Sequence, residues 1–322
     1  MTILLTGAAG FIGSHLTEQL LAVGHQVIGL DNFDDQYDPY RKYDNIHAFA
    51  EHPRFELIKG DIRDQALVSD LLKRHACDTV VHLAARTGVR TSVTEPARCL
   101  DVNVNGTLSL LEAMRVTNVG RLVMASSSSV YGNSNNVPFR EDDSANQPLS
   151  PYAMSKRSGE LLAYTYHHLY GFDIACLRFF TVYGPRQRPE MAISRFTEQL
   201  INEQPITLFG DGTTARNYTY IHDTVMGILR AIYCLSGYNL LNVGGPTSVT
   251  LHELVQLIER AVGHKATIDW QPAQPGDVVL TCADLSLAAE RIGYRPTVSI
   301  DEGINRFVRW YKQDLAKNET HI

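Results

Sequence analysis

The sequence predicts an α/β protein, in which a Rossmann-type, doubly wound parallel sheet is followed by a smaller mixed α/β part. Short apolar runs alternate with longer segments of helical spacing up to about residue 183. No tandem hairpin pattern interrupts this alternation, as expected for parallel strands joined by right-handed helical crossovers. A glycine-rich turn directly follows the first apolar run, where such folds bind nucleotides.

Six apolar runs are predicted as strands buried on both faces of the sheet. They are Ile3–Leu5, Val27–Leu30, Glu56–Ile58, Thr79–Leu83, Leu122–Ala125 and Ile174–Phe179. Helical spacing is clearest over Gly13–Val23 and Val102–Arg115, which would cover the sheet. The alternation therefore extends over the first 184 residues.

The alternation of strand and helix patterns ends after Gly184, where a polar loop bounded by two prolines (185–189) begins. Beyond it we expect strands at 206–209, 238–243 and 267–270, and helices near 223–235, 250–262, 284–292 and 301–313. We therefore assign residues 1–184 to a first domain and 185–322 mainly to a second, leaving room for a strand or helix to return. Ligands of open α/β sheets bind outside the carboxyl ends of the strands, so the site is expected between the two parts.

Composition excludes several classes of protein. Of the 322 residues, 44% are apolar, which is enough to form a buried core. A net charge of −6 provides no basic field for nucleic acid or for an anionic membrane. The five cysteines are scattered and lack metal-ligand spacing, which favours reduced thiols, no metal site and a cytoplasmic location. We find no signal-peptide pattern and no apolar run near the ~20 residues that a membrane helix needs.

The glycine-rich turn predicts a dinucleotide site. Gly7, Gly10 and Gly13 would allow a tight turn, close backbone approach and close helix packing, and the helix that follows directs free N–H groups at a pyrophosphate. The second strand ends in Asp31, whose carboxylate would bind the ribose hydroxyls and repel a 2′-phosphate. With Asn32 next and no adjacent arginine, NAD is favoured over NADP.

Two further strand ends could frame the cofactor. Asp61 and Ile62 follow the third strand, and Leu83, Ala84 and Ala85 follow the fourth. Small side chains suit a backbone lying against a cofactor, although they suit plain close packing equally well.

A hydroxyl-rich strand end and a helix predict an acid/base site. Ser126–Ser129 follow the fifth strand, where buried hydroxyls need partners. Tyr152 and Lys156 are four residues apart, so they share one helical face. A nearby ammonium would lower the tyrosine pKa, and such a pair can interconvert an alcohol and a ketone.

The sequence resembles the extended short-chain dehydrogenase/reductase family, and within it the NAD-dependent nucleotide-sugar epimerases and dehydratases. The resemblance rests on T-G-A-A-G-F-I-G at residues 6–13, Asp61 in G-D-I, S-x-x-V-Y-G at 127–132 and Y-x-x-x-K at 152–156, and it spans essentially the whole chain. It implies an NAD-dependent reaction at sugar C4, in which Tyr152 takes the O4 proton, Lys156 lowers its pKa and binds the nicotinamide ribose, and Ser127 hydrogen-bonds O4.

The cofactor site implied by the motifs and the resemblance is a large set. Asn103 is similar to a family residue that buttresses the helix and cofactor, although a polar helix cap explains it equally well. The candidate cofactor-binding residues are Gly7, Gly10, Phe11, Ile12, Gly13, Asp31, Asn32, Asp61, Ile62, Leu83, Ala84, Ala85, Asn103, Ser126, Tyr152, Lys156 and Phe179.

Residues near Val130 distinguish reactions within the family. The 4,6-dehydratases have an Asp-Glu pair where this chain has Ser128 and Ser129, and UDP-glucuronate decarboxylases have Glu at the Ser129 position. Serines cannot supply the acid and base that eliminate water. The pattern is therefore that of a 4-epimerase.

Three positions make the chain most similar to UDP-glucuronate 4-epimerases. Thr181 replaces the usual Asn of UDP-galactose 4-epimerases, Arg188 lies in a similar loop, and Gln274 replaces an Arg. We expect Ser127, Ser128 and Thr181 to hold the C6 carboxylate away from the alignment that releases carbon dioxide, with Arg188 near the sugar or diphosphate and Ser129 also in the substrate site. For Arg188 a surface position in a polar loop is the alternative.

The resemblance also implies which residues bind the nucleotide of the substrate and what the oligomeric state is. It implies that Arg216 grips the diphosphate and that Asp277 accepts from the uridine ribose. Helices near 92–116 and 152–170 pair across a dimer axis in this family, so a homodimer is expected. The alternatives are a UDP-glucose/UDP-galactose 4-epimerase, a UDP-glucuronate decarboxylase, and a non-catalytic NAD-binding sensor.

Overall fold

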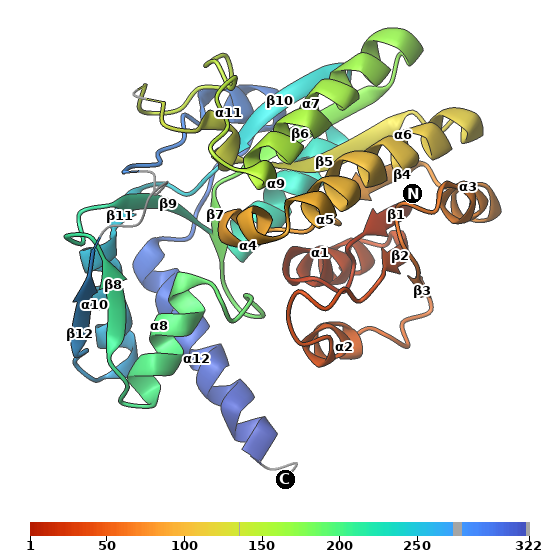
Figure 1. Ribbon diagram of the computed structural model, residues 1–322. Coiled ribbons are helices and arrows are strands. Elements are labelled where there is room, and N and C mark those ends of the chain that lie inside the picture. Colours follow the sequence, from red (N-terminus) through yellow and green to blue (C-terminus); the bar gives the residue numbers. More distant parts are fainter. Residues whose placement is uncertain (135, 273–278, 320–322) are drawn as a thin grey trace.

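A seven-stranded, fully parallel sheet forms the centre of the molecule (Figure 1), with the order β10-β6-β5-β4-β1-β2-β3. The computed structural model describes residues 1–134, 136–272 and 279–319. The strands of this sheet are β1 (Thr2–Thr6), β2 (Gln26–Asp31), β3 (Phe55–Lys59), β4 (Thr79–His82), β5 (Arg121–Ser127), β6 (Asp173–Phe179) and β10 (Tyr238–Val243). The predicted α/β class and the six strands expected before Gly184 are confirmed, with small differences at their ends.

Helices cover both faces of this sheet. On one face lie α3 (Gln65–Arg74), α6 (Gly106–Thr117) and α7 (Pro151–Tyr170), and on the other lie α1 (Phe11–Ala22) and α9 (Ile221–Tyr233). Strand residues alternate between the two layers: Leu4 packs with the first set of helices, whereas Ile3 and Leu5 pack with the second. Because both faces are covered, the strands are apolar almost throughout.

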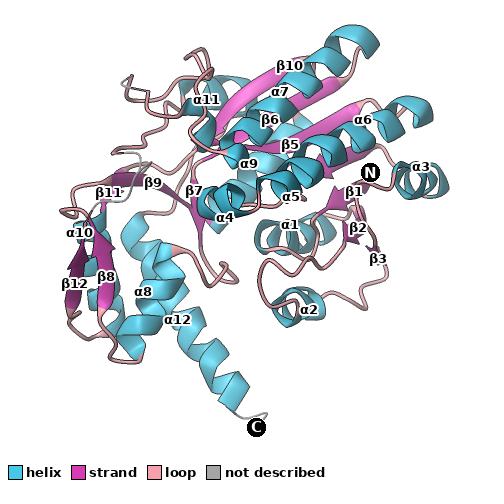
Figure 2. Cartoon of the chain, viewed as in Figure 1, coloured by secondary structure: helices cyan, strands magenta, loops and turns pink. Residues whose placement is uncertain are grey.

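The remaining elements are two small sheets, seven further helices and two single turns among the described residues (Figure 2). A three-stranded sheet contains β7 (Thr181–Tyr183), β9 (Ala215–Tyr220) and β11 (Ser248–Thr250), and a two-stranded sheet pairs β8 (Ile206–Phe209) with β12 (Ile268–Gln271). The helices are α2 (Tyr40–His47), α4 (Val89–Thr94), α5 (Pro96–Leu100), α8 (Ala192–Ile201), α10 (Leu251–Val262), α11 (Ser286–Ile292) and α12 (Ile300–Glu319), with a π-helical turn η1 (Asp101–Asn105) and a 3-10 turn η2 (Ser128–Tyr131).

Two elements that follow Gly184 in the sequence, β10 and α9, pack with the first part of the chain. The β10 strand lies beside β6 in the main sheet, and α9 packs against α1 on that sheet. Leu241 and Val243 of β10 are fully buried, so this strand completes the core of the first part. The domain boundary at Gly184 itself remains a prediction.

The helix predicted over Val102–Arg115 is interrupted. Its beginning is the π-helical η1, and regular α6 starts at Gly106. Single π-helical turns occur often at functional sites, and this one contains Asn103.

Three of the five cysteines are buried, and all five are free thiols. Within the described ranges, no helix combines the length and the apolar composition needed to cross a membrane. Those same residues contain no cluster of His, Cys, Asp and Glu suited to a metal ion.

Candidate active site

A cavity of about 450 Å³ opens at the carboxyl ends of the central strands. Its walls come from the glycine-rich turn, the ends of β2, β4 and β5, the start of α7, and residues 179–191. The predicted site residues that line it are Gly7, Gly10, Phe11, Ile12, Gly13, Asp31, Asn32, Ile62, Leu83, Ala84, Ala85, Ser126, Ser127, Ser128, Ser129, Tyr152, Lys156, Phe179, Thr181 and Arg188. Residues from seven separate segments of the sequence thus meet at one edge of the sheet.

The glycine-rich turn fits a dinucleotide backbone. Gly7 has φ +74°, and a Cβ added there would lie 2.8 Å from the Ala84 nitrogen. A Cβ at Gly13 would lie 2.0 Å from the Gly7 oxygen. Helix α1 begins just after Gly10 with no side chain capping its first amides. These free N–H groups and the positive end of the helix dipole suit a pyrophosphate.

Asp31 sits at the end of β2 and is almost fully buried. Its carboxylate accepts hydrogen bonds from the backbone nitrogens of Ala9 (3.1 Å) and Phe33 (2.8 Å). The Lys42 ammonium lies 3.5 Å from Asp31 Oδ1 and also lines the cavity. A carboxylate has about four acceptor positions, so Asp31 keeps capacity for ribose hydroxyls. Lys42 was not predicted, because a single lysine on a short helix carries no motif.

Two predicted cofactor residues lie behind the cavity wall instead of in it. Asp61 accepts a hydrogen bond from Asn32 Nδ2 at 3.0 Å, and the hydrogen bonds from Arg63 hold the pKa of Asp61 at about 2. Asn103 accepts from the Arg86 backbone nitrogen at 2.8 Å and donates to Ser155 Oγ at 2.9 Å. Asp61 therefore orients Asn32, and Asn103 ties the loop after β4 to the catalytic helix.

The geometry of the predicted acid/base pair comes from the start of α7. Ser150 caps this helix by accepting from the Ala153 nitrogen at 3.1 Å, and Pro151 occupies its first turn. Lys156 Nζ donates to the Ala125 carbonyl at the end of β5 at 2.9 Å. Ser127 hydrogen-bonds to the hydroxyl of Tyr152 and donates to Ser129 Oγ at 3.0 Å. Tyr152, Lys156 and Ser127 therefore converge at one point of the cavity.

Burial dominates the ionisation of this pair. It raises the pKa of Tyr152, against the hydrogen bond from Ser127 and the positive charge of Arg188. It also lowers the pKa of Lys156 to about 8, against the opposing effects of Cys99 and of the Glu160 carboxylate. Burial therefore outweighs the groups that lower the tyrosine pKa in the protein without ligand, and the effect expected of Lys156 stays a prediction. Lys156 is buried and Tyr152 half-buried, and desolvation penalises the charged form of each.

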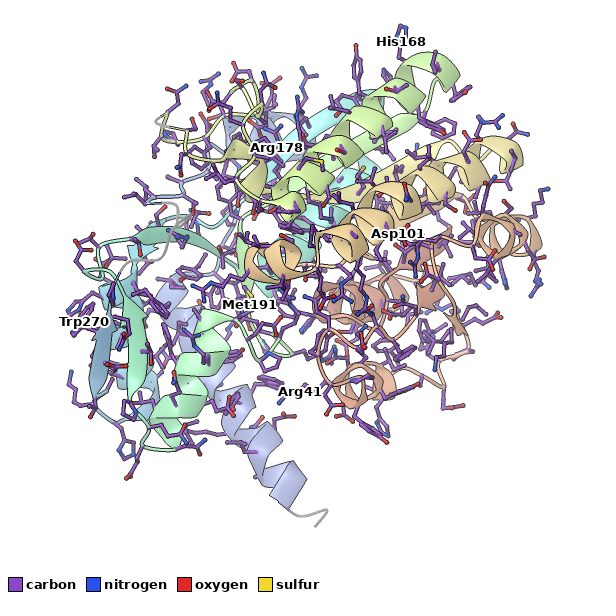
Figure 3. All side chains as sticks on the ribbon, viewed as in Figure 1. Arg41, Asp101, His168, Arg178, Met191 and Trp270 are labelled. Carbon is purple, nitrogen blue, oxygen red and sulfur yellow. The ribbon has the colours of Figure 1, made fainter. Side chains whose placement is uncertain are left out.

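A buried ion pair supports the catalytic helix from behind. Arg178, labelled in Figure 3, contacts the carboxylate of Glu160 through Nε and Nη2, both at 2.9 Å, and both side chains are almost inaccessible to solvent. Ser126 Oγ donates to the same carboxylate at 2.6 Å. The hydroxyl of Ser126 therefore serves this network, although the residue also lines the cavity.

A second cavity of about 230 Å³ adjoins the first and shares Thr181, Gln187 and Met191 with it. Met191, labelled in Figure 3, comes from the loop before α8. Three arginines line this second cavity: the predicted Arg216 together with Arg90 and Arg195, which were not predicted.

Burial, with the charge of Arg90, lowers the pKa of the Arg195 guanidinium, whose Nε has no hydrogen-bond partner. Such a guanidinium gains most from a dianionic ligand. In the first cavity, Arg188 pairs with Glu190 at 2.8 Å. The predicted Asp277 and Gln274 lie outside the described residues.

Comparison with known proteins agrees with this site. The family model described as GDP-mannose 4,6 dehydratase matches residues 4–307. The chain is 42% identical over 313 residues to a UDP-glucuronate 4-epimerase of Thermodesulfobacterium geofontis (strain OPF15), covering 97% of this chain and 96% of that protein. It is similar to the crystal structure of UDP-glucuronic acid 4-epimerase from Bacillus cereus in complex with UDP-glucuronic acid and NAD, with a TM-score of 0.92 and 38% identity over 97% of this chain and 99% of that one. It is also similar to UDP-glucose 4-epimerase from Thermotoga maritima with UDP-glucose, with a TM-score of 0.90 and 31% identity over 98% and 100% of the two chains.

Proposed function

Because the chain belongs to the GDP-mannose 4,6-dehydratase family of extended short-chain dehydrogenases/reductases, we propose that it is an NAD-dependent 4-epimerase that interconverts UDP-glucuronate and UDP-galacturonate. The UDP-glucuronate 4-epimerases of the comparison support the substrate, and their solved structures support NAD. The observation that carries the reaction type is the constellation of Tyr152, Lys156 and Ser127 beside serines at 128 and 129.

The residues of the cavity have separate tasks in this reaction. Bound NAD supplies a hydride acceptor and donor at C4 of the sugar. Tyr152 takes the O4 proton as the 4-keto sugar forms and returns it later, while Ser127 holds O4 by a hydrogen bond. Lys156 is fixed against the Ala125 carbonyl, one helical turn from Tyr152, and would hold a ribose hydroxyl of bound NAD. Arg188 supplies the positive charge that opposes the effect of burial on the Tyr152 pKa.

The serines at 128 and 129, which line the cavity next to Ser127, support epimerisation without elimination of water. Ser128 and Ser129 stand where an acid and a base would be needed to remove water from the sugar. Together with Thr181 they offer neutral hydroxyl donors to a C6 carboxylate. Because a 4-keto sugar carries that carboxylate β to a ketone, several directional hydrogen bonds are needed to keep the bond to the carboxylate out of line with the ketone. We assign this restraint to Ser127, Ser128 and Thr181.

Incubation of the purified protein with UDP-glucuronate, without added reductant, tests the proposal. The expected product is UDP-galacturonate with negligible carbon dioxide. A pentose product with gas would mean decarboxylation. Turnover of UDP-galactose alone would leave the mechanism but overturn the C6 assignment.

The variant Tyr152→Phe separates an enzyme from an NAD-binding sensor. It should retain bound NAD and lose about 10²–10⁴-fold in kcat, the usual contribution of a general acid/base. Undiminished epimerisation by this variant would remove Tyr152 from the mechanism.

We further infer a homodimer formed by α6 and α7. Both helices expose apolar side chains away from the sheet: Leu108 and Val116 on α6, and Met154 and Leu161 on α7, each 37–53% accessible. Such adjacent exposed apolar residues are typical of association sites, and the family resemblance names a second copy as the occupant. Leu161→Arg should convert a dimer to a monomer in sedimentation analysis, and a wild-type monomer would contradict the inference. Five free thiols support a reducing, cytoplasmic location.

A further inference from the structure

Two loops on either side of β1 are joined across the glycine-rich turn. In the sheet, β1 lies between β4 and β2 (Figure 1). The loop after β2 contains Asp34 and Gln36, and the loop after β4 contains Arg86 and Thr87. Since these loops leave strands that flank β1, any contact between them passes over the carboxyl end of β1. That end carries Gly7–Gly13, the predicted pyrophosphate site.

Four hydrogen bonds among Asp34, Gln36, Arg86 and Thr87 form the part of this connection that we call the clasp, and Arg98 of α5 adds a further hydrogen bond to Asp34 at 3.0 Å. Arg86 Nη1 donates to the two carboxylate oxygens of Asp34 at 3.0 and 3.1 Å. The Gln36 side-chain amide donates to the Thr87 carbonyl and accepts from the Thr87 nitrogen at 3.2 Å. All four residues line the large cavity.

The clasp is anchored on both sides. The backbone of Arg86 is held by Asn103, which accepts from its nitrogen at 2.8 Å and donates to its carbonyl at 2.9 Å. On the other side, Asp34 accepts from the Gln36 nitrogen at 3.0 Å, which fixes the turn. The side chains of Arg86 and Asp34 are only 9% and 18% exposed. Their ion pair is therefore screened less by salt than a surface pair is.

From this geometry we propose that the clasp retains NAD in the enzyme by closing over the pyrophosphate and opening only when the cofactor leaves. The proposal rests on the proposed function. Epimerisation needs the same cofactor molecule for both halves of the reaction, so loss of cofactor halfway would leave a 4-keto sugar unreduced. A bridge across the bound dinucleotide slows this loss without touching the reacting atoms.

The test is cofactor exchange in the purified holoenzyme, measured without any sugar. Protein loaded with radiolabelled NAD is diluted into excess unlabelled NAD, and the bound label is followed with time. Arg86→Met and Gln36→Leu should each raise the dissociation rate about tenfold to a hundredfold, the range expected when hydrogen bonds to a charged or desolvated partner are lost. Both variants should also release free 4-keto sugar during turnover.

A matched control is Glu95→Gln. Glu95 pairs with the same guanidinium, with 3.0 Å between its Oε2 and Arg86 Nη2, but it lies on the same side of β1 as Arg86 and does not bridge the site. This variant should exchange NAD at the wild-type rate. Asp34→Asn, which keeps an acceptor oxygen but loses the charge, provides a second probe if Arg86→Met does not fold.

Two results would overturn the proposal: folded clasp variants that exchange NAD as slowly as wild type, or a Glu95→Gln control that exchanges as fast as they do. Failure of the proposed function is separate, since it would show as absent turnover of UDP-glucuronate while the exchange rates still decide the role of the clasp.

Discussion

Replacing Glu160 by Gln should weaken both the fold and the catalytic site. Glu160 is 0% exposed and accepts from Arg178, from Ser126 and from Arg157, the last at 2.8 Å. The Glu160→Gln variant leaves the buried guanidinium of Arg178 without its counter-charge. Breaking a buried pair in this way costs about 3–5 kcal/mol. We expect the low end of that range, because the Gln oxygen still accepts one hydrogen bond.

Denaturant unfolding followed by circular dichroism measures this loss. Glu302→Gln is the matched control, since its pair with Arg306 is 45–49% exposed and such pairs contribute about 0–1 kcal/mol. Replacing both Glu160 and Arg178 by Met should destabilise less than Glu160→Gln alone, because no charge stays buried unpaired. If Glu160→Gln unfolds at the same denaturant concentration as Glu302→Gln, the reasoning is refuted.

The pH dependence provides a second check. Burial would raise the pKa of Glu160, but Arg178, Ser126 and Arg157 together hold it below its usual value of 4.5. A lowered pKa in the folded protein stabilises it above pH 4.5, and this contribution is lost as the pH falls through the folded-state pKa. The stability difference between wild type and Glu160→Gln should therefore shrink in acid. Since Glu160 also raises the pKa of Lys156, the variant should shift the alkaline limb of the activity profile to lower pH.

Three further changes test the cofactor site and the nucleotide end. Lys156 has a pKa of about 8 in the folded protein and 10.5 in the unfolded chain, so the unfolded chain binds more protons between these pH values. The stability of wild type relative to Lys156→Met should therefore rise with pH over this range. Unfolding at pH 7, 9 and 10 measures the change. Gly13→Ala would place its Cβ 2.0 Å from the Gly7 oxygen and should abolish NAD binding in a calorimetric titration, whereas Gly171→Ala, with open space around it, should bind NAD normally. Arg195→Met should raise the KM for UDP-glucuronate about tenfold with kcat nearly unchanged, consistent with loss of a guanidinium–phosphate contact; an unchanged KM would remove Arg195 from the substrate site.

Strand ends were predictable from sequence because chemistry and position coincide there. A buried strand is recognised from its apolar residues, and a glycine, acid or hydroxyl that follows it must lie at the ligand edge of a parallel sheet. Gly7, Asp31 and Ser127 were found in this way and all line the cavity. The Y-x-x-x-K pair was found from its helical spacing together with the glycine-rich turn and the serine-rich strand end that precede it.

Contacts between loops were not predictable by the same reasoning. Lys42, Arg86 and Arg195 lie on short helices or irregular segments, where a charged side chain is usually solvated and carries no periodic signal. Their roles depend on which loops meet above the sheet, and this follows from the strand order, with β1 between β4 and β2. The β10 strand was found as a strand, but its return to the main sheet depends on packing between distant segments.

The ionisation of Tyr152 shows why residue spacing alone cannot give a catalytic pKa. A lysine one turn away suggests a stabilised phenolate, yet Lys156 donates to the Ala125 carbonyl, and burial raises the pKa of the tyrosine while lowering that of the lysine. The unloaded site thus favours a neutral phenol. Within the protein, the Ser127 hydrogen bond and the charge of Arg188 oppose this effect of burial on the Tyr152 pKa, and the cofactor ring would add positive charge when bound. We therefore expect the acid/base power of Tyr152 to be a property of the loaded enzyme, which ties proton transfer to the presence of NAD and makes cofactor retention by the clasp a condition for catalysis.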